Sequence, residues 1–382
     1  MQKRISLIIF IGLLLISCNI HEKGKESISA EFKLISGYDL LEPEHNGMFV
    51  ISPDDRLDFA DFDSLASVPV CDDPTCKHQH PDVEENYISD KDCHAYGKNN
   101  HPFIYNDKLY YFRTTDYTSE DNKYYQSTDM WQCSINGADN RKICSFDKLV
   151  LPTYSKAMLY DSKVWLLMTR QPYDMQMKDL EPSIELVSAD LESREVQTYG
   201  TVKSSYSIGG RMIGVSGGKV IFEVNYPETN MPFMDKVSSY AEEHGISETD
   251  AMIWISGNEK YCFDQYEVSR DSFVKCEEQD LFGITEKGCY YFDNGNLRFV
   301  GANGAEKLYD IDAAGGGFYD VGEYLHIFNA EKAYLIDEEK LEFYPLKDKP
   351  DIVYVKDGKA IIRDYTNDKK PFKKVAVSEL KK

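Results

Sequence analysis

The amino-acid sequence predicts an all-β fold built from repeated hairpins. Aromatic residues make up 13% of the 382 residues, led by 27 Tyr and 19 Phe, and large aromatic side chains favour strands over helices. Short turns rich in Gly, Asn and Asp recur along the chain, and each is followed by a run of aromatic and aliphatic residues. Such turns supply the positive-φ positions that tight hairpins need, so we expect antiparallel strands.

The hairpins repeat as units of similar length. Seven of them share a turn followed by an aromatic-rich or aliphatic strand, at residues 45–51, 105–112, 160–167, 215–222, 285–292, 319–328 and 355–362. Most are followed by a second hairpin, which makes a four-stranded meander. Meanders that repeat at roughly 30–50 residues indicate a β-propeller. We therefore expect residues 32–382 to form one propeller of seven blades, with six or eight blades as the alternatives.

The last unit is shorter than the others. From Asp351 onwards it contains three clear strands, at Ile352–Val355, Ala360–Asp364 and Phe372–Val377. We expect an N-terminal strand at Phe32–Ile35 to supply the fourth strand of that sheet. This closure would join the two ends of the ring and remove open sheet edges, which favour aggregation.

One unit carries an insertion. The fourth unit exceeds the repeat length, and its excess lies at residues 226–257. Met234–Glu243 and Ser247–Trp254 are predicted to be short helices, because Ser247 is a suitable N-cap residue and acids follow it in the first turn. An insertion of this kind lies on one face of the ring, often the functional face. A lid or packing element without a ligand is the alternative.

The N-terminus has the features of an export signal. Lys3 and Arg4 precede an apolar run at Ile5–Ile16. Its twelve residues are too few to span a bilayer, which needs about 20, and a basic start before a short apolar run is typical of a secretory signal.

The end of this signal resembles the lipobox of bacterial lipoproteins. The residues Leu-Ile-Ser-Cys stand at positions 15–18. The resemblance implies cleavage after residues 1–17 and lipidation of the Cys18 thiol, with the polar residues 18–31 as a flexible tether. The protein would then be anchored to a bacterial membrane on its exported side. A plain signal peptide with an incidental cysteine is the alternative.

The net charge limits the range of partners. Removal of residues 1–17 leaves 41 basic and 65 acidic residues, a net charge of −24. A charge of this sign repels nucleic-acid phosphates and anionic lipid headgroups. The expected contacts are therefore the membrane, through the lipid on Cys18, and an extracellular ligand or partner protein, but no nucleic acid.

Chemistry is concentrated in the connection at residues 71–100. Three cysteines and three histidines occur between Cys71 and His94, in a chain with nine Cys and eight His. A connection of this length without its own core needs a cross-link to be ordered. One candidate is a structural metal ion, for which Zn²⁺ suits three thiolates and one imidazole; its ligands would be Cys71, Cys76, Cys93 and either His78 or His80. A disulfide among the three cysteines is the alternative, because exported proteins retain disulfides.

The same segment resembles a group of uncharacterised β-propeller lipoproteins from bacteria of anaerobic habitats. The resemblance rests on a short motif and on the weaker hairpin pattern behind it, the motif being Val68-Pro69-Val70-Cys71, Cys76, His78, Cys93 and Ala95-Tyr96. The gap between His78 and Cys93 is longer than the pattern of that group. The resemblance implies a fold and an exported location but no activity.

A second cross-link is predicted farther along the chain. Cys133 and Cys144 flank a turn at residues 136–139 and would form a disulfide if the hairpin register placed them opposite each other. His326 alternates with apolar residues and is expected to be a satisfied core or channel residue. Five arginines lie at or near the ends of inner-type strands and are candidates for anion binding in a central channel, namely Arg113, Arg170, Arg211, Arg298 and Arg363.

Two functions remain open from the sequence. No nucleophile elbow, phosphate loop or zinc-protease helix is present, so no catalytic residue is assigned. A binding or scaffolding module for an extracellular ligand or partner protein is the first hypothesis. A carbohydrate-active hydrolase or lyase with a central pocket is the second, and converging carboxylates with shifted pKa values in a deep pocket would favour it.

Overall fold

The computed structural model describes most of the chain after the N-terminal region. The described residues are 32–36, 40–42, 45–52, 56–78, 93–98, 100–118, 124–152, 155–170, 182–205, 208–269, 271–277, 280–293, 296–311, 317–329, 331–364 and 372–382. The predicted signal peptide, the tether with Cys18, and His80 lie outside them. Within the described part, no helix has the length and apolar character needed to cross a membrane.

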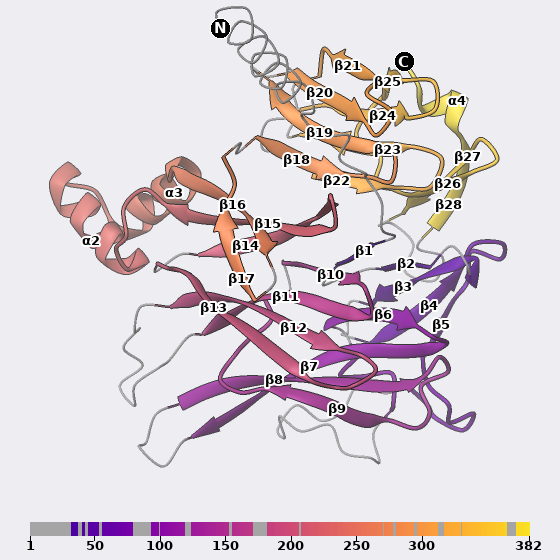
Figure 1. The fold of residues 1–382 in the computed structure, drawn as a ribbon, viewed down its shortest axis with the longest axis horizontal. Coiled ribbons are helices and arrows are strands. Elements are labelled where there is room, and N and C mark those ends of the chain that lie inside the picture. Colours follow the sequence, from indigo (N-terminus) through magenta and orange to yellow (C-terminus); the bar gives the residue numbers. More distant parts are fainter. Residues whose placement is uncertain are drawn as a thin grey trace, which may run out of the picture.

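Seven antiparallel sheets follow one another along the chain and form a seven-bladed propeller, which confirms the predicted fold (Figure 1). Blade 1 contains β2 (Leu40–Glu42), β3 (Gly47–Ile51), β4 (Leu57–Asp61) and β5 (Ser67–Pro69). Blade 2 contains β6 (Asn100–Tyr105), β7 (Lys108–Thr118), β8 (Tyr124–Ser134) and β9 (Arg141–Phe146). Blade 3 contains β10 (Lys156–Tyr160), β11 (Lys163–Arg170), β12 (Ser183–Asp190) and β13 (Val196–Ser204).

The second half of the ring has the same plan. Blade 4 contains β14 (Gly209–Ser216), β15 (Lys219–Pro227), β16 (Tyr261–Ser269) and β17 (Ser272–Lys275). Blade 5 contains β18 (Leu281–Ile284), β19 (Gly288–Asp293), β20 (Asn296–Gly301) and β21 (Glu306–Tyr309). Blade 6 contains β22 (Gly317–Asp320), β23 (Leu325–Phe328), β24 (Ala333–Asp337) and β25 (Glu342–Pro345). Blade 7 contains β26 (Ile352–Lys356), β27 (Lys359–Arg363) and β28 (Phe372–Ala376), followed by the short helix α4 (Val377–Leu380).

The N-terminal strand β1 (Lys33–Ser36) does not complete blade 7, so the predicted closure is wrong. It pairs antiparallel with the inner strand β10 of blade 3, from Lys33 opposite Leu159 to Ser36 opposite Lys156. Figure 1 shows β1 in the middle of the molecule beside β10. The inner edge of β10 offers the same unpaired backbone groups as blade 7 would, and burial of Ile35, which is 0% exposed, stabilises this position.

Two further contacts hold β1 and the preceding Phe32 in the ring. The Lys33 ammonium lies 2.6 Å from the Glu42 carboxylate of blade 1. The ring of Phe32 packs closely against Gly214 of blade 4. If Gly214 had a Cβ atom, that atom would lie 2.8 Å from the Phe32 ring and 2.9 Å from Ile284 of blade 5. Strand β1 is thus in contact with the inner strands of several blades at once.

The ring closes by side-chain packing instead of a shared sheet. Met48, Val50, Ala60 and Phe62 of blade 1 form one apolar cluster with Ile361 and Phe372 of blade 7. The Phe62 ring also stacks on Tyr354 of blade 7, with centroids 5.1 Å apart. Comparable clusters join the other neighbouring blades, so the last sheet needs no fourth strand.

The predicted insertion forms a helical hairpin between β15 and β16. It consists of α2 (Phe233–His244) and α3 (Glu248–Asn258), which project from the ring at the left of Figure 1. The Ser247 side chain accepts a hydrogen bond from the Asp250 amide, which confirms the predicted N-cap. The two helices share a small core of their own, made by Val237, Ala241, Ala251 and Ile255.

Candidate metal centre

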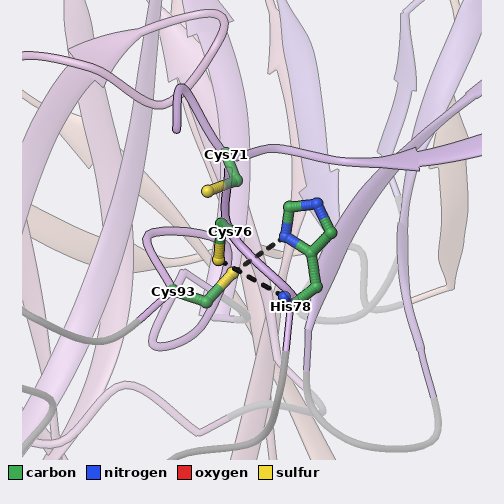
Figure 2. A group of neighbouring side chains, drawn as sticks. All are labelled: Cys71, Cys76, His78 and Cys93. Atoms are coloured by element: carbon green, nitrogen blue, oxygen red, sulfur yellow. Dashed lines mark hydrogen bonds between the residues drawn. The ribbon is translucent and has the colours of Figure 1, made fainter. Parts of the chain in front are cut away.

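The four ligand atoms of a possible metal site lie together in the connection from blade 1 to blade 2. Cys71, Cys76 and His78 follow β5, and Cys93 precedes β6; their three sulfur atoms and one imidazole nitrogen all lie within 4.8 Å of one another. Figure 2 shows these side chains converging. Ligand sulfurs around a tetrahedral Zn²⁺ are about 3.8 Å apart, from Zn–S bonds of about 2.3 Å, so a small contraction would complete such a site.

Among the described histidines, His78 is the one that joins the cysteines. Its Nδ1 lies 3.3 Å from the Cys93 sulfur, and its backbone amide donates to the Cys76 sulfur at 3.3 Å (Figure 2). His78 has a φ of +51°, a left-handed conformation that non-glycine residues rarely adopt. This turn returns the imidazole toward the thiols, which supports a functional reason for the strain.

The segment from Cys93 to Lys98 fastens the site to blade 1. The Ala95 carbonyl accepts a hydrogen bond from the Leu57 amide of β4 at 2.9 Å. The buried Tyr96 donates its hydroxyl hydrogen to the His78 carbonyl at 3.2 Å. The segment from Cys93 to Lys98 and the His78 backbone are therefore held in place by contacts that do not involve the thiols.

A second pair of side chains bridges the two halves beside the site. The Nδ1 atom of His94 lies 2.5 Å from the Asp72 carboxylate. Burial acts to raise the pKa of Asp72, but the hydrogen bond from His94, a backbone hydrogen bond and the charges of His94 and Lys98 together outweigh it and leave the pKa below its usual range. No role was predicted for Asp72 from the sequence, although its place next to Cys71 was a usable signal.

The Cys93 thiol is resistant to ionisation without a metal. Burial, followed by the neighbouring Cys76 and Cys71 thiols, raises the pKa of Cys93 to about 12. The three cysteines are free, so the disulfide alternative is not formed in this structure. The arrangement suits a metal ion, because a cation removes the mutual repulsion that three neighbouring thiolates would otherwise have.

The disulfide predicted between Cys133 and Cys144 is not formed. The register of β8 and β9 places Cys144 opposite Met130 and Lys142 opposite Trp131, with an irregularity between the two pairs. Cys133 is buried and its backbone position is displaced from Cys144 along the hairpin. Both thiols are free, because the register does not bring them opposite each other.

The five arginines proposed for anion binding are engaged within the blades. Arg170 and Arg211 form ion pairs with Glu185 at 2.6 Å and with Glu223 at 3.0 Å. The others lie over aromatic rings or near a carboxylate, as in the contacts of Arg113 with Trp131, Arg298 with Tyr291 and Arg363 with Asp351. The structure therefore gives no support to an arginine-lined channel.

A cavity of about 530 Å³ lies among the turns of blades 5, 6 and 7. Burial raises the pKa of two of its carboxyl groups, Asp320 and Glu338. Each already has a local partner: Asp320 accepts from the Gly322 amide at 2.9 Å, and Glu338 from the Thr285 hydroxyl at 2.7 Å. These hydrogen bonds fix a turn of blade 6 and connect blades 5 and 6.

No family model and no curated protein matches this chain. Among solved structures, sucrose-6-phosphate hydrolase from Lactobacillus gasseri is 10% identical over 91% of this chain and 85% of that one, with a TM-score of 0.31. An oligogalacturonate lyase in complex with manganese is 11% identical over 69% of this chain and 78% of that one, with a TM-score of 0.34. The N-terminal domain of Nup159 is 11% identical over 91% and 96%, with a TM-score of 0.30. Likenesses of this strength carry no argument about function.

Proposed function

We propose that this protein is an exported, lipid-anchored β-propeller that acts as a binding or scaffolding module for a partner protein. The observation that carries the proposal is the exposed apolar surface of the helical insertion. Six large apolar side chains of residues 233–254 are exposed, including Met234 at 50%, Ile253 at 69% and Trp254 at 47%. This number of exposed large apolar side chains on one short insertion is typical of interaction sites.

These six side chains, the insertion face, are Phe233, Met234, Ile246, Met252, Ile253 and Trp254. Trp254 is held in place by stacking on Tyr240, with ring centroids 4.4 Å apart. A rigid, half-exposed aromatic side chain is a frequent anchor in protein interfaces.

The charges around the insertion face favour a basic partner. Five acidic residues of the insertion are exposed, namely Asp235, Glu242, Glu243, Glu248 and Asp250. Lys236 is paired with Glu259. The fitting occupant is an apolar protein segment with a positively charged rim, since complementary charges steer association and exclude like-charged partners. A second acidic copy of this chain fits less well.

The position of the N-terminal strand favours a protein as the partner of the insertion face, in preference to the membrane that carries the lipid anchor. In a meander, successive connections between strands lie at alternate ends of the sheet. The insertion is the second connection of blade 4, so it lies at the end opposite the first turn. Lys33 lies opposite Leu159, next to the first turn of blade 3, so Phe32 lies at the opposite face. A lipid on Cys18 would attach from that side and leave the insertion face turned outward.

Binding can be tested with a synthetic Lys/Leu amphipathic helical peptide and the full-length protein. Binding should shift the fluorescence of Trp254 and should be lost in Ile253→Asp. Leu308→Asp is the matched control, because Leu308 is 57% exposed on blade 5 and its replacement should leave binding unchanged. Equal binding by both variants, or binding to neutral phosphatidylcholine vesicles in place of the peptide, would overturn this assignment of the partner.

The metal centre has a structural role in this proposal. Three thiolates and one imidazole fill a tetrahedral Zn²⁺ site and leave no position open for a substrate. Elemental analysis of the full-length protein should give one equivalent of zinc, lost in Cys76→Ser and kept in Cys276→Ser, whose side chain lies directly after β17 of blade 4. Zinc-free protein with an oxidised pair among Cys71, Cys76 and Cys93 would favour the disulfide instead.

The anchor is supported by the lipobox-like residues 15–18. Growth with an alkynyl fatty acid should label the wild-type protein and leave Cys18→Ser unlabelled. Unlabelled wild-type protein would contradict the anchor and leave the binding test unaffected.

The carbohydrate-active enzyme remains the second candidate because of the cavity with Asp320 and Glu338. Incubation with a panel of soluble polysaccharides would test it by the release of reducing ends. Wild-type activity that is lost in Asp320→Asn would favour the enzyme over the binding module. An inactive wild-type protein would contradict the enzyme hypothesis.

A further inference from the structure

Lys98 is a fully buried lysine between the metal centre and blade 2. It is 0% exposed. Its ammonium donates a hydrogen bond to the Gly137 carbonyl at 3.1 Å and lies 5.7 Å from the ring centroid of Tyr111. No role was predicted for Lys98 from the sequence, because a lysine after a motif is usually a solvated residue.

The local contacts do not compensate its charge. Among the described residues, no carboxylate forms an ion pair with Lys98, and the nearby Arg113 carries the same sign and acts to lower its pKa. A buried ammonium without a counter-charge costs several kcal/mol. The position therefore calls for an anionic group nearby.

The metal centre is the neighbouring group with the required sign. Cys133 and, with smaller contributions, Asp72 and Cys71 favour the protonated form of Lys98 against its burial. Burial raises the pKa of Cys133, so its thiol is not the missing anion. Gly137 lies between Lys98 and the start of the metal centre. A Cβ atom at Gly137 would lie 2.6 Å from the Val70 carbonyl oxygen and 3.2 Å from the Lys98 ammonium. Val70 directly precedes Cys71. Asp72 is already bonded to His94, which leaves the ligand set as the unbalanced anion.

Three thiolates, one neutral imidazole and Zn²⁺ carry a net charge of −1. We propose that Lys98 is the buried counter-ion of the Cys71/Cys76/His78/Cys93 metal centre and stabilises the metal-bound state by balancing this charge. The inference rests on the proposed metal centre. It makes Lys98 a positioning residue for the metal, which links the site to the core of blade 2 through Gly137 and Tyr111.

Zinc affinity measured by chelator competition on the full-length protein tests this role. Lys98→Met should weaken zinc binding about 10- to 100-fold, the usual range for outer-shell partners of a metal. Lys77→Met is the matched control, because Lys77 lies between two ligands yet is exposed, and it should change affinity less than twofold. Lys98→Arg keeps the charge and should retain most of the affinity.

The melting temperature separates charge balance from simple packing. In zinc-loaded protein Lys98→Met should melt below wild type, and in zinc-stripped protein it should melt at or above wild type, because the uncompensated charge is gone. The Gly137 carbonyl keeps a second donor in Asn140 at 2.9 Å. A decrease of equal size in both states would show a packing role and overturn the inference.

The two proposals fail in different ways. Wild-type protein that binds no zinc refutes the metal centre itself. Wild-type protein that binds one zinc, with Lys98→Met indistinguishable from Lys77→Met, refutes only the role of Lys98. Should Lys98→Met not fold, the comparison of Lys98→Arg with Lys98→Gln at equal zinc loading decides the matter, since only the arginine keeps the counter-charge.

Discussion

The Lys156 ammonium at the start of β10 donates a hydrogen bond to the Phe318 carbonyl of β22 at 3.2 Å. These strands are the inner strands of blades 3 and 6, which lie on opposite sides of a seven-bladed ring. The same ammonium lies 4.3 Å from the ring centroid of Tyr319. The inner strands therefore approach each other closely, which leaves little space for the central substrate pocket that an enzyme of this fold would use.

The pKa of Lys156 should make stability depend on alkaline pH. Burial, with a smaller contribution from Arg211, lowers this pKa to about 8, below the value of about 10.4 expected for the unfolded chain. Between these values the unfolded state binds more protons, so the free energy of unfolding rises with pH, by about 1–3 kcal/mol. The buried thiols and tyrosines titrate alike in both proteins, so the contribution of Lys156 appears as a difference. Between pH 7.5 and 10, the change in the free energy of unfolding measured in urea should be more positive for wild type than for Lys156→Met.

Lys373→Met is the control for that comparison, because Lys373 lies on blade 7 with a 55% exposed side chain. Its pH dependence should match wild type. Parallel curves for Lys156→Met and wild type would contradict the assigned pKa.

His326 should contribute to the loss of stability in acid. It is 3% exposed, its Nε2 has no hydrogen-bond partner among the described residues, and burial lowers its pKa to about 4. The sequence expectation of a core position is confirmed, but that nitrogen is not satisfied. From pH 6.5 down to 4 the unfolded state gains a proton that the folded state excludes, so the free energy of unfolding falls by about 2–3 kcal/mol.

His326→Leu should flatten this part of the pH profile and be more stable than wild type at pH 4.5. Chemical denaturation at pH 7 and 4.5 provides the measurement. His244→Leu is the matched control, since His244 is exposed at the end of α2. The assignment fails if both variants lose stability in acid as wild type does.

Strand β1 should contribute strongly to stability through Ile35. Ile35 is fully buried among residues of blades 1, 2 and 3, and truncation of a buried isoleucine to alanine costs about 2–5 kcal/mol. Denaturant titration of Ile35→Ala should show this loss. Val68→Ala, at a 57% exposed position of blade 1, should stay within about 0.5 kcal/mol of wild type; similar losses in both would mean that β1 is not packed as described.

The helical insertion should be removable without loss of the ring. The β15–β16 ladder extends to Pro227 opposite Tyr261, and the next residues, Glu228 and Lys260, are still joined by a backbone hydrogen bond at 3.0 Å. Replacement of residues 229–259 by Asn-Gly should therefore close blade 4 with a tight hairpin turn. Zinc content and the strand signal in circular dichroism should match wild type, the helical signal should disappear with α2 and α3, and binding of the basic peptide should be lost. An unfolded variant would show that the insertion supports the ring.

Local sequence features predicted most of this architecture. Turn chemistry and strand composition act over a few residues, so the hairpins, the blade number and the Ser247 N-cap could be predicted. The partner of β1 could not, because a four-residue strand fits several open sheet edges and tertiary packing of Ile35 decides between them. The register that separates Cys133 from Cys144 depends on an irregularity next to Met130, which composition does not reveal.

The ligands of the candidate metal centre were also predicted in part from the sequence. Cysteine spacing identified Cys71, Cys76 and Cys93 and left His78 and His80 as alternatives. His78 lies with the thiols because of its left-handed backbone conformation, a property that its neighbours in the sequence do not specify. The burial of Lys98 depends on Gly137, which is distant in the sequence, and so only the folded chain shows it.

The place of β1 imposes an order on folding. The first described strand of the chain forms its backbone ladder with β10, so during synthesis or export it has no strand partner until residues 156–160 are available. Until then the inner strands of the neighbouring blades lack one of their packing partners. The start of the chain is therefore captured by a later blade, and any factor that holds the N-terminus away would delay packing around β10.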